Sequence, residues 1–146
     1  NQDDANIISY HWANSGPYKF GSYVGAGRTG SDGDVQDGAF INVGGAPQSL
    51  FAKKVVASTI GWIHHARQYN TLVNANASDS YMALNTTAAK EDSTGTYGGV
   101  GGDFVSTGWK NRGGFTDMNE SGVTIIYGAF GIQPLTDGAI NQGRAK

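Results

Sequence analysis

Two adjacent histidines, His64 and His65, have side chains suited to metal binding or acid–base chemistry. They follow Trp62 in an apolar run that predicts a β-strand, in which neighbouring side chains point to opposite faces. The two imidazoles therefore cannot hold one metal ion together, and we expect at least one of them to face the interior or a groove. A zinc or catalytic role competes with a hydrogen-bonded structural role, and the sequence does not show whether distant His11 comes near.

Three aspartates, Asp32, Asp34 and Asp37, lie close enough in sequence to surround a hard cation such as Ca²⁺. The run departs from the EF-hand pattern, which has Gly where Asp37 stands and a bidentate Glu where Val43 stands. Two interpretations therefore stay open: an irregular calcium site, or a solvated turn whose aspartates cap backbone amides. We expect no other cofactor.

Residues 25–30 spell G-x-G-x-x-G, the pattern of a dinucleotide-binding turn. That chemistry also needs a helix whose first amides face the phosphates, whereas Asp and Gly dominate residues 31–38. We expect a hairpin loop here. Because no G-x-S-x-G motif is present and the carboxylates fall mostly in turns, we expect no enzymatic activity.

The elements that carry these residues are predicted to be β-strands. Glycine supplies 23 of the 146 residues, which disfavours long helices, and short apolar runs alternate with turn clusters. The pattern predicts an all-β fold, an antiparallel β-sandwich or jelly-roll-like single domain with long loops. The last strand has apolar residues on both faces and is expected to be central. The predicted strands cover residues 18–24, 39–43, 49–56, 59–65, 80–84, 103–106, 108–112 and 123–131.

Charge and composition exclude several classes of partner. The formal net charge is −2 with no block of either sign, so we expect no nucleic-acid partner. There is no cysteine, and the core must be stable without disulfides. The longest apolar run, residues 123–132, is too short to cross a bilayer, so we expect no membrane insertion. Because the chain starts at Asn1 and not at Met, we expect further sequence upstream.

Aromatic residues are expected to serve two purposes. Trp62 and Trp109 occupy apolar strand positions and are predicted to belong to the core. Tyr69, Tyr97 and Phe115 fall in or beside loops, where a ring can stack on a sugar or cover its own sheet edge. Residues 70–79 form a predicted polar surface loop that supplies the remaining ligand-binding candidates, Asn70, Asn74 and Asn76.

Three segments are expected: an N-terminal arm or entry strand over 1–17, the β-sandwich over 18–135, and a polar tail over 136–146. The apolar positions of the arm have little local strand partner, which favours association with further copies of the chain, a trimer being our first expectation. These positions are Ile7, Ile8, Tyr10 and Trp12.

Three motifs in the second half of the chain resemble the successive strands of a Gly-rich β-sandwich domain of bacteriophage virion proteins. They are residues 81–89 (YMALNTTAA), 103–110 (DFVSTGWK) and 121–130 (SGVTIIYGAF). The resemblance spans residues 18–135 and is to the tail-fibre type found in marine and cyanobacterial phages. The chain departs from that family at 64–69 and in the longer 32–37 loop, where its own specificity is expected.

This resemblance implies a virion structural protein at the particle surface, without a catalytic site. We expect a C-terminal tail-fibre or receptor-binding domain that contacts a glycan or protein of the host surface through its loops. The alternative is a capsid decoration or cement protein, or another self-assembling surface protein, whose partners are virion subunits.

Overall fold

The computed structural model describes residues 11–27, 38–56, 61–69, 77–78, 80–87, 89, 91–92, 101–112 and 115–134. The strands are β1 (Tyr18–Val24), β2 (Phe40–Asn42), β3 (Gly45–Ala46), β4 (Ser49–Lys54), β5 (Ile63–Ala66), β6 (Ala77–Ser78), β7 (Ser80–Ala83), β8 (Glu91–Asp92), β9 (Gly102–Val105), β10 (Gly108–Asn111), β11 (Thr124–Phe130) and β12 (Gln133–Pro134). A 3₁₀ turn covers Arg67–Tyr69, and one short helix, α1, covers Thr116–Asn119.

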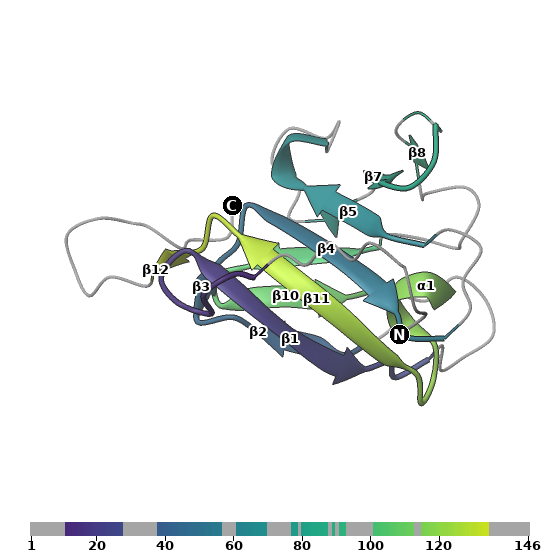
Figure 1. Cartoon of the computed structure of the whole chain (residues 1–146), viewed down its shortest axis with the longest axis horizontal. Coiled ribbons are helices and arrows are strands. Elements are labelled where there is room, and N and C mark those ends of the chain that lie inside the picture. The colour runs from purple at the N-terminus through teal and green to yellow at the C-terminus, as the bar shows by residue number, and fades with distance from the viewer. Residues whose placement is uncertain are drawn as a thin grey trace, which may run out of the picture.

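Two antiparallel sheets form the fold. The large sheet has the order β1-β11-β4-β5-β7-β8, and the small sheet has the order β2-β10-β9-β6. In Figure 1 the β1, β11 and β4 ribbons run in front of the β2 and β10 ribbons, with α1 at one end. β12 and β3 pair in a separate two-stranded ribbon. The predicted all-β antiparallel sandwich is therefore confirmed, and β11 lies between β1 and β4, as expected of a central strand.

Alternation along β4 shows how the sequence divides between the two faces of the large sheet. Leu50 and Ala52 are fully buried and face the small sheet, whereas Phe51 and Lys53 are only half-buried and face outward. Neighbouring side chains of a strand point to opposite faces, so alternate residues of β4 lie in the core and the residues between them lie on the outer surface. The large sheet thus has an inner face toward the core and an outer face.

The core between the sheets contains Trp109, Phe104 and Tyr81, all fully buried. The prediction for Trp109 is confirmed. The prediction for Trp62 is wrong: its neighbour Ile63 is the buried residue, and Trp62 is half-buried against the outward-facing Phe51. The cause is the strand period, because an inward Ile63 turns the preceding side chain outward.

Several short elements differ from the sequence-based expectation. Ala77–Ser78, inside the predicted 70–79 loop, pairs with β9 as β6, and Gly45–Ala46, which lies between the predicted strands 39–43 and 49–56, pairs with β12. Two-residue strands carry too little periodicity to be recognised from sequence. Residues 70–76 and the aspartate loop 32–37 lie outside the described residues.

The helix α1 is anchored to the large sheet through a buried cation. Lys54 is 8% exposed on the inner face of β4, with its Nζ 2.7 Å from Glu120 Oε2 and 3.3 Å from Asp117 Oδ1. The hydrogen bond to Glu120 raises the pKa of Lys54 above its ordinary value, against the opposing effect of burial. This ion cluster fixes the end of the sandwich where β1 leaves the sheet.

Candidate functional site

The outer face of the large sheet carries a continuous group of aromatic rings, here named the aromatic face. Its members come from β1, β4, β11 and the segments before β1 and β5: Trp12, Tyr18, Phe20, Phe51, Trp62 and Phe130. Successive ring centroids are 5.4 Å apart for Trp12–Phe20, 5.5 Å for Phe20–Phe130, 4.9 Å for Phe130–Phe51 and 5.6 Å for Phe51–Trp62. The rings therefore form one connected apolar surface across the sheet.

Strand register brings these rings together around a glycine. Gly128 of β11 is paired with Phe20 on one side and with Phe51 on the other. A Cβ at Gly128 would lie 2.9 Å from ring atoms of both phenylalanines, closer than ordinary contact allows. The missing side chain lets the two rings lie over the central strand, which continues the aromatic face without a gap.

Trp12 adds a ring to the aromatic face from the segment before β1. The Asn14 Oδ1 accepts a hydrogen bond from the backbone N–H of Phe20 (2.9 Å), and the Ser15 carbonyl accepts one from Tyr18 (3.3 Å). These bonds hold residues 11–17 against β1, and the Trp12 ring stacks on Phe20 with 20° between the planes. The described part of the predicted N-terminal arm thus lies on its own domain.

A groove of about 410 Å³ opens in this face, lined by Trp12, Phe51, Trp62, Leu84 and Asn85. The Asn85 Oδ1 accepts a hydrogen bond from the backbone N–H of Trp62 (3.1 Å), which ties the wall after β7 to the segment before β5. Trp12 and Leu84 are 56% and 51% exposed, so the apolar walls are open to solvent. We name this cavity the groove. Its size is within the range of small-molecule sites, and it combines rings with one amide.

Lys53 places a cation beside the groove, with its Nζ over the Trp62 ring and 6.0 Å from the ring centroid. In the described parts of β1, β11, β4, β5 and β7 it is the one charged side chain on the outer face. The small sheet differs, because its outer surface holds Asp103, Lys110 and Arg112, with an Arg112–Asp103 ion pair of 2.7 Å. The two outer faces therefore differ in chemistry.

Tyr69, predicted as a ligand-binding ring, lies beside the aromatic face. Its hydroxyl and the Nδ1 of His64 share a hydrogen bond of 2.9 Å, and the two rings meet edge to face at 5.3 Å. His64 is paired with Phe51 across the β4–β5 ladder. Burial lowers the pKa of His64 below its ordinary value, which favours the neutral ring. Tyr69 is thereby fixed next to the groove-lining strands.

His65 faces the core, as expected for one of the two histidines. Its Nδ1 lies 2.9 Å from Ser78 Oγ and 3.1 Å from the Ser80 carbonyl. Because a carbonyl can only accept, the proton is on Nδ1, and Nε2 has no hydrogen-bond partner among the described residues. Burial lowers the pKa of His65 to about 3. No group of three metal-ligating side chains occurs in the described part of the chain.

The described glycines of the G-x-G-x-x-G motif do not form a phosphate cradle. The backbone N–H groups of Gly25, Ala26 and Gly27 donate to the Val123 carbonyl, the Asn119 Oδ1 and the Asn119 carbonyl, at 2.9, 3.0 and 2.8 Å. Amides that already donate inside the protein cannot bind a phosphate. This part of the motif is a loop stem held by α1. The hairpin-loop interpretation is wrong, because β1 and the next described strand, β2, belong to different sheets and do not pair.

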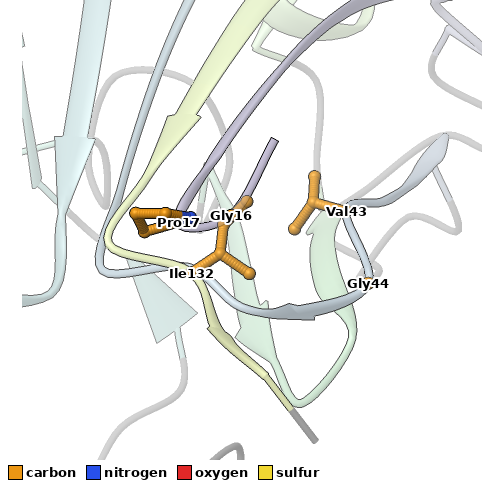
Figure 2. Close-up of a pocket in the computed structure, with 5 residues that line it drawn as sticks. All are labelled: Gly16, Pro17, Val43, Gly44 and Ile132. Atoms are coloured by element: carbon orange, nitrogen blue, oxygen red, sulfur yellow. The ribbon is translucent and has the colours of Figure 1, made fainter. Parts of the chain in front are cut away.

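A second pocket, of about 300 Å³, lies just before the first residue of β1, at the opposite end of that strand from Gly25 (Figure 2). It is lined by Gly16, Pro17, Val43, Gly44 and Ile132. No side chain in this wall bears a polar group that could orient a ligand, and specific sites need a few such groups. The groove in the aromatic face is therefore the better candidate.

The other predicted ligand-binding residues divide into two groups. Asn70, Asn74, Asn76 and Tyr97, like Asp32, Asp34 and Asp37, lie outside the described residues. Phe115 is 2% exposed and belongs to the core, so its interpretation as a ring covering its own sheet is the correct one.

Sequence reasoning missed the aromatic face because strand aromatics were expected in the core. The signal was present in β4, where Phe51 stands between the inward Leu50 and Ala52. An aromatic residue on the opposite parity from the core residues of its strand must face outward.

Comparisons with known proteins add a family but no function. In the described residues, no helix has the length and hydrophobicity that crossing a membrane requires. No curated protein and no solved structure matches the chain. A family model does match residues 1–134, nearly the whole length. The chain belongs to the family described as a domain of unknown function, DUF7483.

Proposed function

We propose that this domain is a virion surface module that attaches a phage particle to its host, and that the aromatic face makes the contact. The observation that carries the proposal is the groove of about 410 Å³ between Trp12 and Trp62. Aromatic rings supply a large contact area at little conformational cost, and a concave apolar site with few polar groups is typical of ligand binding. The virion context comes from the resemblance of residues 18–135 to phage domains.

The contrast between the outer faces supports the choice of surface. Asp103 and Arg112 on the small sheet neutralise each other, and Lys110 donates to the Gly38 carbonyl at 2.6 Å. On the large sheet, Trp12 and Tyr18 are 56% and 44% exposed, so part of the connected rings is open to solvent. Contiguous apolar patches of this kind mark interaction sites. The proposed contact is thus a sheet face, with Tyr69 beside it, in place of a surface made of loops alone.

Adsorption of the labelled domain to a panel of bacterial cells, with marine and cyanobacterial strains included, tests the proposal. We expect Trp12→Ala and Trp62→Ala to weaken adsorption by about tenfold each, since central aromatic residues dominate interface energies. Phe40→Ala is the matched control, because Phe40 is a 46% exposed ring on the small sheet. It should leave adsorption unchanged.

Failure of the unmodified domain to adsorb to any cell, together with binding to purified capsids, would support the decoration alternative. A single site for a sugar or a peptide binds its ligand weakly, and an oligomer that carries several such sites binds a surface more tightly through multivalency. We therefore propose that the attached form is a homo-oligomer, with a trimer as the first expectation. Light scattering of the full chain at high concentration tests this, and a monodisperse monomer would contradict it.

A further inference from the structure

We propose that the groove binds an acidic glycan, in which a pyranose ring stacks on Trp62 and a singly charged carboxylate or sulfate group of the sugar pairs with Lys53. This inference rests on the proposed function and names the ligand class of the same site. Three features of the groove support it: the geometry of the rings, the amide in the wall, and the cation beside Trp62.

The rings offer apolar faces that match one side of a sugar. Trp62 packs edge to face on Phe51 with centroids 5.6 Å apart, so the two rings are held at 79° to each other. Trp12 forms another wall and is itself held by its stacking on Phe20. A rigid corner of rings suits a pyranose, whose C–H groups cover one face while its hydroxyls point outward.

The wall opposite Trp12 comes from the turn after β7. Leu84 donates its backbone N–H to the Trp62 carbonyl (2.9 Å), and Asn85 accepts the backbone N–H of Trp62 (3.1 Å). These two bonds fix the turn to the segment that carries Trp62. An exposed carboxamide beside an indole is the type of polar group that orients a hydroxylated ligand over a ring.

The positive charge of Lys53 favours an acidic ligand. Its Nζ is 6.0 Å from the Trp62 ring centroid, so an anionic group on a sugar stacked there comes within reach of the ammonium. No described acidic side chain on the outer face of β1, β11, β4, β5 or β7 neutralises it. One positive charge complements one negative charge, which a uronic acid, a sialic acid or a sulfate ester provides.

The experiment measures binding of the full chain to an array of uronic-acid, sialic-acid and sulfated glycans, each printed beside its neutral methyl ester or desulfated form. Affinities for the glycans that bind are then measured by titration, with four variants. Lys53→Gln removes the cation. Lys19→Gln is its matched control, because Lys19 lies on the opposite parity of β1 from the outward-facing Phe20. Trp62→Ala removes the stacking ring, and Trp62→Phe keeps a ring there.

We expect the protein to bind each charged glycan more tightly than its neutral form. Lys53→Gln should reduce this ratio of affinities by about fivefold, as for a half-exposed ion pair. Lys19→Gln should preserve that preference. Trp62→Ala should weaken the binding of charged and of neutral glycans alike by about tenfold. Trp62→Phe, which keeps a ring, should lose less affinity than Trp62→Ala. The array itself distinguishes carboxylate from sulfate. Thermal unfolding of each variant separates loss of the ligand site from loss of the fold.

Two results would overturn the inference. Equal binding of charged and neutral glycans, unaffected by Lys53→Gln, would show that the groove does not select acidic sugars. No glycan binding at all, while Trp62-dependent adsorption to cells persists, would identify the ligand as a protein and leave the proposed function intact. Absence of both glycan binding and adsorption would instead contradict the proposed function itself.

Discussion

The indole N–H of Trp109 donates a 2.9 Å hydrogen bond to the Oδ1 of Asn111, and both side chains are completely buried between the sheets. The two residues are two positions apart on β10 and share its inner face. The indole lies over Gly102 of the neighbouring strand, where a Cβ would be 2.3 Å from the ring. This arrangement satisfies the one polar atom of the largest core residue, and it leads to the first prediction.

Replacing Trp109 by Ala is expected to destabilise the domain by about 3–5 kcal/mol, because it leaves a large cavity and removes the partner of Asn111. Trp62→Ala, a matched change on the outer face, should cost clearly less since Trp62 is half-buried. Urea unfolding of both variants measures the difference. Equal losses would contradict the assigned facing of the two strands.

Gly128→Val is expected to destabilise the domain by about 1–3 kcal/mol, because its side chain must displace Phe20 and Phe51 from their places over β11. The near-UV circular dichroism of the aromatic face should change as well. Thr124→Val, on the same face of the same strand, is the control and should be nearly neutral. A Gly128→Val protein with unchanged stability and spectrum would show that these rings do not lie over the glycine.

His65 makes stability depend on pH. Burial lowers its pKa in the folded protein to about 3, below the value of 6.5 for an exposed histidine, so the unfolded chain binds a proton that the folded chain does not. The stability that neutral His65 contributes is complete above pH 6.5 and is lost as the pH falls from 6.5 toward 3. Between pH 7 and pH 5 we expect a loss of about 2 kcal/mol.

Urea unfolding at several pH values measures this loss, and His65→Gln is the variant to compare. Its unfolding free energy should vary less between pH 7 and pH 5 than that of the parent, although its absolute stability is lower. His64→Gln serves as a control, because His64 is only half-buried and should contribute less. An unchanged pH slope in the His65 variant would contradict the neutral, buried state of this side chain.

Lys54 and Lys53 form a matched pair for testing the buried ion cluster. Lys54→Met removes the ammonium that pairs with Asp117, which is 6% exposed, and should cost about 3–5 kcal/mol. Lys53→Met, one residue earlier on the outer face, should be within about 0.5 kcal/mol of the parent. Denaturant midpoints of the two variants give the comparison. If Lys54→Met were no worse than Lys53→Met, the cluster would not be intact in solution.

The sequence by itself determined the fold class and the positions of the main strands. Alternating apolar residues and glycine-rich turns are local signals, and they located β1, β4, β10 and β11 to within a few residues. The same signals placed β11 at the centre, since both of its faces carry apolar side chains, and Trp109 in the core. Local periodicity requires no knowledge of which strands pair.

Only the tertiary structure decided where the aromatic residues of opposite parity are located. Phe20, Phe51 and Phe130 are far apart in sequence, and the antiparallel order β1-β11-β4 makes them neighbours on one face. The buried Lys54 likewise depends on α1, whose four residues carry no helical period. Pairing order and register are set by contacts between distant segments, so a face shared by three strands cannot be read from any one of them.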